Sequence, residues 1–171
     1  MSLSLEQVIK ICNAKCMINE NIVNQIDFKN IEIQHLLYDS RRLNFIDNTI
    51  FFAFKTTNND GHKYIKELYN KGIRLFICEN LQDLNHFPDA IFVLVKDSLE
   101  SLQKIAKYKR EKFHKEVVAI TGSNGKTIIK EWIVQLTQEN KKIYYSPRSY
   151  NSQIGVALSL WQLNTNYDLG L

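Results

Sequence analysis

The sequence of 171 residues has little cysteine, proline or glycine: three, two and six residues respectively. The three cysteines, Cys12, Cys16 and Cys78, are an odd number, and we expect them in a reducing compartment, where disulfides are rare. Cys12 and Cys16 are four residues apart on an expected helix and could share a metal ion, but no second cysteine or histidine pair accompanies them. We favour burial as small apolar side chains. The sequence also lacks internal repeats and low-complexity tracts.

Long apolar runs are absent as well. No run approaches the ~18 residues that cross a bilayer, and the first residues lack the basic start and apolar stretch of a secretion signal. We therefore expect a cytoplasmic protein with no membrane insertion. The formal charge is only +4, and the basic residues are spread along the chain. This charge suits a small anionic substrate and does not indicate binding to nucleic acid.

One helix concentrates basic residues. It is expected from Asp97 or Ser98 to about Lys112, with apolar residues facing inward at Leu99, Leu102, Ile105 and Ala106. The basic residues that would form its outer face are Lys104, Lys107, Lys109, Arg110 and Lys112. We favour a solvated helix face over a nucleic-acid patch, because no aromatic platform accompanies the charges.

Strands and helices alternate along the chain. A first helix, capped by Ser4 or Ser2, would place Leu5, Val8, Ile9, Cys12 and Cys16 on one face. Strands are expected at residues 30–37, 49–54, 73–78 and 89–95, and a helix around residues 64–69 would end at Gly72. The second strand should be buried on both faces. This alternation predicts an α/β fold with mainly parallel sheets.

A short polar segment around residues 113–115 marks the expected domain boundary. We predict a small N-terminal α/β domain at residues 1–114, and at residues 115–171 the beginning of a P-loop-type parallel α/β ATPase domain. The second part opens with an apolar strand at residues 117–120, a turn, and a helix at residues 128–136. A strand at 141–145, a loop, a helix at 154–163 and a strand from Tyr167 follow. Val156, Leu160 and Leu163 should lie on the packed side of that helix.

The turn between strand and helix carries the clearest chemical signal. Gly122 and Gly125 let backbone N–H groups approach an anion, and the helix N-terminus adds further donors. Lys126 would reach the β- and γ-phosphates, and the Thr127 hydroxyl would ligate Mg²⁺. The expected ligand is a nucleoside triphosphate, and its binding residues are Thr121, Gly122, Ser123, Asn124, Gly125, Lys126 and Thr127, of which Lys126 and Thr127 are the catalytic candidates.

This loop is shorter than the usual phosphate-loop pattern. That pattern, G-x-x-x-x-G-K-[ST], has its first glycine five residues before the glycine that precedes lysine, and here Ile120 stands at that position. A corner that uses glycines only to turn is the structural alternative. We do not favour it, because a simple turn has no need of Lys-Thr at the start of the helix.

Three other segments combine polar side chains with strand or helix ends. They are residues 38–41, containing Asp39, Ser40 and Arg41; residues 59–62, containing Asp60, Gly61 and His62; and residues 149–156, containing Asn151 and Ser152. The planar fork of Arg41 suits uracil carbonyls or phosphate oxygens, and Arg42 is an alternative to it. The structural alternative for the other residues is that they form turns or cap helices. Arg148 is a further candidate for an anion contact.

Together with the loop T-G-S-N-G-K-T, these segments resemble the Mur ligase family, ATP-dependent enzymes that add amino acids to the cell-wall precursor. The resemblance spans most of the chain in the family's order. It implies that Asp39, Ser40, Arg41, Asp60, Gly61 and His62 bind the UDP end of the substrate, and that Asn151 and Ser152 contact substrate or Mg²⁺. The family often has Asn at position 152 and Pro at position 157, where this chain has Ser152 and Ala157.

The resemblance also implies a reaction. Within the family, residues 60–62 and 151–155 are most similar to members that attach D-alanyl-D-alanine to UDP-N-acetylmuramoyl-tripeptide. The family's next glutamate, its second-metal residues and its amino-acid-selecting domain would follow residue 171, so we expect a part of a larger enzyme with no ligase turnover of its own. Alternatives are a diaminopimelate- or lysine-adding ligase, a folylpolyglutamate or cyanophycin synthetase, or a nucleotide-dependent module without catalysis.

Overall fold

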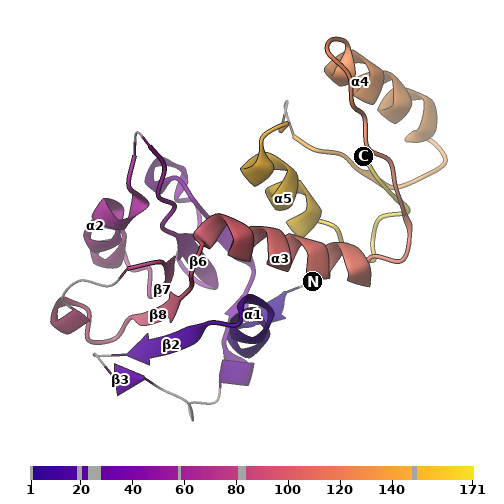
Figure 1. The fold of residues 1–171 in the computed structure, drawn as a ribbon. Helices are drawn as coiled ribbons and strands as arrows, with labels where there is room; N and C mark the ends of the chain where they lie inside the picture. The colour runs from indigo at the N-terminus through magenta and orange to yellow at the C-terminus, as the bar shows by residue number, and fades with distance from the viewer. Residues whose placement is uncertain (1, 19–20, 23–27, 58, 81–83, 148–149) are drawn as a thin grey trace. The chain divides into compact units, whose positions relative to one another are not determined.

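The computed structural model describes residues 2–18, 21–22, 28–57, 59–80, 84–147 and 150–171 (Figure 1). Over these residues the chain divides into two compact units, an N-terminal unit of residues 2–101 and a C-terminal unit of residues 102–171. The division falls inside helix α3 (Ser98–Lys112), so this helix contributes residues to both units. The functional boundary after residue 114 stays a prediction.

The N-terminal unit is built on a sheet of six strands in the order β3-β2-β8-β7-β6-β5. Strands β5 (His35–Leu37), β6 (Thr49–Phe52), β7 (Leu75–Cys78) and β8 (Ile91–Leu94) are parallel. Strands β2 (Lys15–Ile18) and β3 (Asn21–Ile22) continue the sheet in antiparallel fashion. The short strands β1 (Leu3–Ser4) and β4 (Glu32–Ile33) pair separately. The expected α/β fold with parallel strands is confirmed.

One core cluster of this unit contains residues of the sheet and of helix α2 (Ile65–Asn70). Phe76 stacks on Phe92 with ring centroids 5.2 Å apart and meets Phe51 edge-on at 6.4 Å. All four residues of β6 and of β7 are buried, which confirms the expectation that the strand at 49–54 is covered on both faces. Burial of these continuous apolar runs fixes the central strands in the core. The carboxyl ends of these parallel strands lie along one edge of the sheet.

Local signals set the helix ends of the N-terminal unit. Ser4, one of the two predicted caps, begins α1 (Leu5–Cys12) and forms a capping box with Gln7. Gly72 follows α2 with φ of 104°, a left-handed conformation that suits glycine, and so ends that helix. Cys16 does not extend α1, because Asn13 turns the chain in a left-handed conformation and residue 16 is buried in β2.

The expected strand at residues 30–37 is two strands. Gln34 separates β4 from β5, and the N–H groups of Gln34 and His35 both donate to the carbonyl oxygen of Asn48, at 2.9 and 3.1 Å. The chain changes sheets at this point, since β4 pairs with β1 and β5 pairs with β6. Alternating hydrophobicity predicted the extended backbone correctly but not its division.

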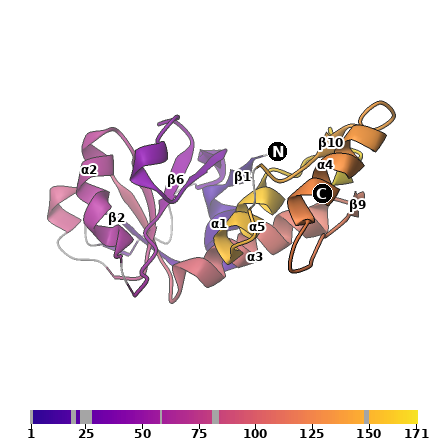
Figure 2. The same cartoon turned by 90° about the horizontal axis from the view of Figure 1, so that it is seen from above.

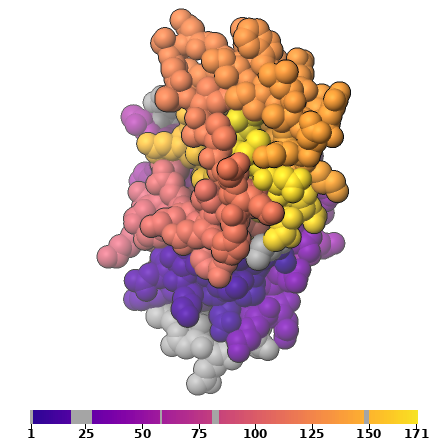
Figure 3. Space-filling view, turned by 90° about the vertical axis from the view of Figure 1, so that its right-hand side faces the viewer, coloured from indigo at the N-terminus to yellow at the C-terminus, as the bar shows by residue number. Residues whose placement is uncertain are grey.

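The C-terminal unit contains a smaller parallel sheet in the order β10-β11-β9. Its strands are β9 (Glu116–Val117), β10 (Ile143–Tyr144) and β11 (Leu169–Gly170). Along the chain, helix α4 (Lys126–Thr137) follows β9 and helix α5 (Gln153–Trp161) follows β10 (Figure 2). Figure 3 shows the yellow C-terminal residues between the segment near residue 115 and the orange residues, as this strand order requires. The predicted sequence of strand, loop and helix is confirmed.

Two expectations about side-chain burial in this unit are wrong. Lys109 is only 3% exposed, with its ammonium 4.8 Å from the centre of the Trp161 ring, so it does not belong to a solvated face. Burial lowers the pKa of Lys109. Val156 is 47% exposed and lines a cavity, while Ala157 and Trp161 face the interior. No helix within the described residues is both long and apolar enough to span a membrane.

Candidate functional site

A tight loop joins the end of the β9 segment to α4. The N–H of Val118 still donates to the carbonyl of Gly170, at 2.9 Å, and the chain then leaves the sheet. Gly125 has φ of 78° and Gly122 φ of 152°, backbone conformations that L side chains rarely adopt. Nothing lies within 4 Å of a Cβ built on Gly125, so glycine is required there by backbone conformation and not by crowding.

The start of α4 supplies anion-binding groups. Gly125 is its N-cap residue and has no side chain, so the first N–H groups of the 12-residue helix have no side-chain cap. These donors and the positive end of the helix dipole favour a negative ligand. Thr127 lies in this first turn and is exposed. The arrangement is that of a phosphate-binding loop.

Lys126 folds back over this loop. Its ammonium donates to the carbonyl of Gly122 and, at 3.4 Å, to that of Ser123. A phosphate would replace these neutral acceptors by charged oxygens, which form stronger hydrogen bonds with an ammonium. The lysine is therefore already held beside the donors of the helix N-terminus.

A cavity of about 520 Å³ opens beside this loop. We call it the phosphate-loop cavity. Of the predicted site residues, it is lined by Thr121, Gly122, Lys126, Thr127 and Asn151; Ser123, Asn124, Gly125 and Ser152 do not line it. Its remaining walls come from the β9 and β11 ends, from Lys130 of α4, and from residues after β10 and along α5. The structure thus brings Asn151 to the same cavity as Lys126 and Thr127.

Tyrosines form part of the wall opposite α4. Burial raises the pKa of Tyr144 to about 12, although a hydrogen bond with Ser159 opposes the shift. Tyr144 and Tyr150 both line the phosphate-loop cavity. Tyr144 therefore remains a neutral phenol at physiological pH and adds no negative charge where an anion would bind.

Ser152 has a structural position. Its hydroxyl accepts from the N–H of Gly155 at 3.0 Å and caps α5, as its place before a helix suggests. Arg148 and Ser149 lie outside the described residues. Asn151 and Ser152 are both exposed, but only Asn151 lines the phosphate-loop cavity.

A second group of predicted residues lies in the N-terminal unit, after β5. Asp39 accepts from the backbone of Arg41 at 3.1 Å and pairs with its guanidinium through two bonds of 2.8 Å. The hydrogen bond from the Arg41 side chain is the main reason that the pKa of Asp39 is lowered. The Arg41 side chain is 87% exposed and Ser40 is buried. Arg42 donates to the Tyr38 hydroxyl at 3.0 Å and also pairs with Asp39, at 3.7 Å.

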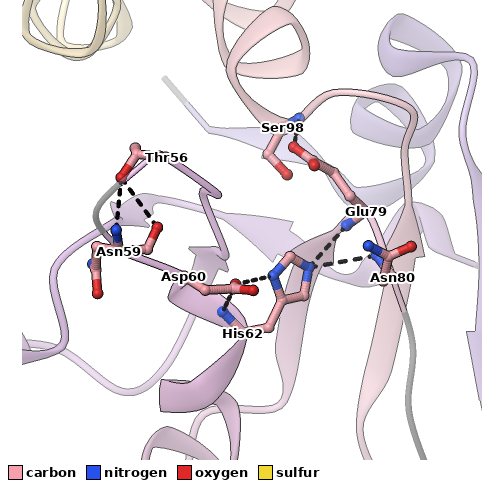
Figure 4. A network of polar contacts seen from close by, with 7 residues as sticks. All are labelled: Thr56, Asn59, Asp60, His62, Glu79, Asn80 and Ser98. Carbon is pink, nitrogen blue, oxygen red and sulfur yellow. Dashed lines mark hydrogen bonds and ion pairs between the residues drawn. The ribbon is translucent and has the colours of Figure 1, made fainter.

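The third predicted group follows β6, and its polar side chains form hydrogen bonds with other residues of the protein (Figure 4). Asp60 accepts from the backbone N–H of His62 at 3.0 Å and contacts its Nδ1 at 2.6 Å; the backbone bond is the first cause of the lowered pKa of Asp60. His62 Nε2 accepts from the N–H groups of Glu79, at 3.1 Å, and Asn80, at 3.4 Å. This pattern requires the neutral tautomer with a proton on Nδ1.

Gly61 is needed where the chain comes close to β6. A Cβ at this position would lie 2.8 Å from the backbone nitrogen of Phe54 and 2.9 Å from its oxygen. Asp39, Asp60 and Glu79 all follow carboxyl ends of neighbouring parallel strands, β5, β6 and β7. That edge is where open parallel sheets bind ligands.

Three residues escaped the sequence analysis. Lys130, buried in the wall of the phosphate-loop cavity, lies four positions after Lys126, and this spacing could have identified it. Tyr150 lines the same cavity but carried no signal of its own. Glu79 accepts from the N–H of Ser98 at 2.9 Å and so caps α3 (Figure 4); its partner is 19 residues away, beyond any local pattern.

The described residues contain no group of three or more histidine, cysteine or acidic side chains able to hold a metal ion. A divalent ion at the phosphate loop would therefore depend on the Thr127 hydroxyl and on ligand oxygens. Mg²⁺ is commonly bound in this way, with one or two protein ligands, phosphate oxygens and water. The donor set fits Mg²⁺ brought in with a nucleotide.

Comparison with known sequences identifies relatives over most of the chain. A UDP-N-acetylmuramoyl-tripeptide–D-alanyl-D-alanine ligase of Borreliella burgdorferi is 32% identical over 150 residues, which are 82% of this chain and 32% of that protein. A UDP-N-acetylmuramoyl-L-alanyl-D-glutamate–2,6-diaminopimelate ligase of Clostridium botulinum is 34% identical over 99 residues, 56% of this chain and 20% of that protein. No family model matches.

Solved structures share the fold. A UDP-N-acetylmuramoylalanyl-D-glutamyl-2,6-diaminopimelate–D-alanyl-D-alanyl ligase of Acinetobacter baumannii matches 99% of this chain with 35% of its own, at a TM-score of 0.83 and 22% identity. A MurF ligase of Thermotoga maritima in complex with ADP matches 80% of this chain with 31% of its own, at a TM-score of 0.67 and 27% identity. This chain spans about a third of the length of these proteins.

The fold and the loop before α4 define a nucleotide-binding α/β protein with a phosphate loop. The two sequence relatives and the two solved structures narrow this class further, because all four proteins are named as ligases. The chain belongs to the Mur ligase family.

Proposed function

We propose that this chain is the UDP-substrate-binding and ATP-binding part of a ligase that adds D-alanyl-D-alanine to UDP-N-acetylmuramoyl-tripeptide. The observation that carries the proposal is the phosphate-loop cavity, in which Lys126, Thr127 and Asn151 meet at the N-terminus of α4. The relative from Borreliella burgdorferi, which carries this activity in its name, supports the choice of substrate.

ATP binding is assigned to residues 121–127. The N–H groups of the loop and of the first turn of α4 would hold phosphate oxygens, and Lys126 would neutralise charge on the γ-phosphoryl group as it is transferred. Thr127 would hold Mg²⁺ together with phosphate oxygens. When bound, the metal ion supplies countercharge to the phosphates. The ADP complex of the Thermotoga maritima protein supports nucleotide binding in general.

The proposed reaction has two steps. The substrate's terminal carboxylate takes the γ-phosphoryl group and becomes an acyl phosphate, and ADP leaves. The amine of D-alanyl-D-alanine then attacks the acyl carbon, forming the amide and releasing phosphate. Residues of this chain contribute position and charge, because phosphoryl transfer needs little covalent chemistry from the protein.

The carboxyl edge of the larger sheet is the proposed site for the UDP end. Arg41 is exposed and offers its guanidinium to phosphate or uracil oxygens, and Arg42 is the alternative. Asp39 preorganises Arg41 through the bidentate pair. Asp60, Gly61 and His62 form the neighbouring loop, and their role in this proposal is to hold its shape. Binding energy from this remote end would help to orient the reacting carboxylate.

A diaminopimelate-adding ligase is the second candidate, supported by the relative from Clostridium botulinum. Calorimetry with the 171-residue chain distinguishes the candidates, using UDP-N-acetylmuramoyl-tripeptide, the corresponding L-alanyl-D-glutamate precursor, and a non-hydrolysable ATP analogue with Mg²⁺. We expect binding of the ATP analogue and preference for the tripeptide. Preference for the dipeptide precursor would favour the second candidate, and binding of ATP without any uridine nucleotide would favour a non-catalytic module.

We further propose that these residues alone have no ligase turnover, because they span only about a third of the relatives. A coupled assay for ADP release, run with both substrates and with the purified chain, tests this. Amide formation detected by mass spectrometry above a no-enzyme control would contradict it.

A further inference from the structure

Helix α4 is oriented in an unexpected way. Four apolar side chains are exposed to solvent, with exposed fractions of 54% at Ile128, 43% at Ile129, 61% at Trp132 and 79% at Leu136. Lys130, in contrast, is only 8% exposed. Burying an ammonium group is costly unless polar partners compensate it. The position of Lys130 therefore requires a specific explanation.

The Lys130 ammonium binds the chain that follows β10. It donates to the carbonyl oxygen of Ser146 at 2.8 Å and lies 5.8 Å from the centre of the Tyr145 ring. The N–H of Ser146 donates in turn to the carbonyl of Leu171, also at 2.8 Å. Ser146 is thus fixed from two sides, by α4 and by the residue that follows β11.

Lys130 and Ser146 both line the phosphate-loop cavity, together with Asn151. Lys130 lies one helical turn after Lys126, on the same face of α4. The contact with Ser146 therefore links the helix that carries Lys126 and Thr127 to the segment that leads to Asn151.

We propose that Lys130 is a positioning residue for nucleotide binding. It fixes the start of the segment after β10 against α4, so that the cavity wall containing Asn151 faces Lys126 and Thr127. This inference rests on the proposed nucleotide site and adds a residue to it. Lys130 acts through Ser146 and not by contact with phosphate.

The test compares Lys130→Met, which keeps the length of the side chain without its donor, with Lys130→Arg, which keeps a cationic donor. Lys107→Met is the matched control, because the Lys107 side chain is 78% exposed on α3. Calorimetry gives the affinity for MgADP, and hydrogen exchange gives the protection of residues 143–147. Thermal unfolding, followed in parallel, verifies that each variant is folded.

We expect Lys130→Met to bind MgADP about tenfold more weakly, as is typical when a residue supporting a binding site is lost. Exchange at residues 143–147 should become faster in the same variant. Lys130→Arg should recover most of the affinity and the protection, and Lys107→Met should match the wild type. If Lys130→Met does not fold, Lys130→Arg provides the test. A strong loss of MgADP affinity in Lys130→Arg, with normal exchange protection of residues 143–147, would contradict positioning through Ser146.

Two other outcomes would overturn the inference. If a folded Lys130→Met variant binds MgADP with wild-type affinity, Lys130 has only a structural role and does not position the nucleotide site. Weaker binding with unchanged exchange at residues 143–147 would indicate direct contact with phosphate. If the wild-type chain fails to bind MgADP, the nucleotide-site proposal itself fails, and this result is distinct from a failure of the Lys130 variants.

Discussion

The two units organise their candidate sites by different means. In the N-terminal unit, the site segments follow the carboxyl ends of β5 and β6, and the buried strands β6 and β7 form the core beside them, so a closely packed core positions these segments. In the C-terminal unit the strands are two residues long, α4 leaves apolar side chains exposed, and the loop depends on backbone conformation at Gly122 and Gly125. The first site should therefore depend on core packing, and the second on a few local contacts.

The strongest test of this contrast removes one aromatic ring from each unit. Phe76→Ala deletes a ring with no exposed surface, and should destabilise the N-terminal unit by about 3–5 kcal/mol. Trp132→Ala deletes a ring that is 61% exposed, and should change stability by no more than about 0.5 kcal/mol. Chemical denaturation measures both. Equal destabilisation by the two substitutions would contradict the contrast.

The next largest effect is expected at the phosphate loop. Lys126→Ala removes a charged donor, and should weaken binding of a MgATP analogue by about 10- to 150-fold, or about 1.5–3 kcal/mol. The affinity for UDP should not change, because the proposed UDP site lies in the other unit. Calorimetry with both ligands measures this. Binding of the MgATP analogue by Lys126→Ala with wild-type affinity would rule out the role of Lys126.

A smaller effect is expected from His62→Ala. Loss of the imidazole leaves the N–H groups of Glu79 and Asn80 without this acceptor, and should cost about 1–2 kcal/mol of stability. UDP affinity, measured at a temperature where the variant is folded, should fall less than for Arg41→Ala. The reverse order would mean that His62 contacts the ligand directly, as the family resemblance first suggested.

The smallest effect concerns acid stability. The pKa of Asp39 is lowered from 3.8 mainly by the hydrogen bond from Arg41, and that of Asp60 is lowered by bonds from His62. A carboxylate with a lowered pKa in the folded state stabilises the protein above its unfolded-state pKa, and this contribution disappears as pH falls through the folded-state value. Stability should thus decline below about pH 4, and less steeply for Asp39→Asn. Denaturation curves from pH 6 to pH 2 test this; identical pH slopes for the two proteins would contradict it.

Much of the fold is predictable because its signals are local. The continuous apolar runs of β6 and β7, the capping box at Ser4 and the glycines before Lys126 each specify structure within a few residues. The division of residues 30–37 at Gln34 was not predictable, since it depends on the distant carbonyl of Asn48. The burial of Lys109 beside Trp161 depends in the same way on a residue far along the chain.

The candidate site shows the same limit. Sequence patterns identified the chemical groups of the phosphate loop but not the wall of its cavity, in which Lys130, Tyr150 and Val156 take part. Helical periodicity tells which residues of α4 and α5 share a face, but not whether that face meets a core, solvent or a cavity. Likewise, the D-G-H segment was recognisable, whereas the contact of His62 with Glu79 required the folded chain.

The most direct test is a crystal structure of the chain with Mg²⁺ and a non-hydrolysable ATP analogue. We predict that the triphosphate lies at the N-terminus of α4, with the Lys126 ammonium on its terminal phosphates, the Thr127 hydroxyl on Mg²⁺, and Lys130 still bonded to Ser146. A triphosphate bound elsewhere, with Lys126 still on the carbonyls of Gly122 and Ser123, would contradict the account.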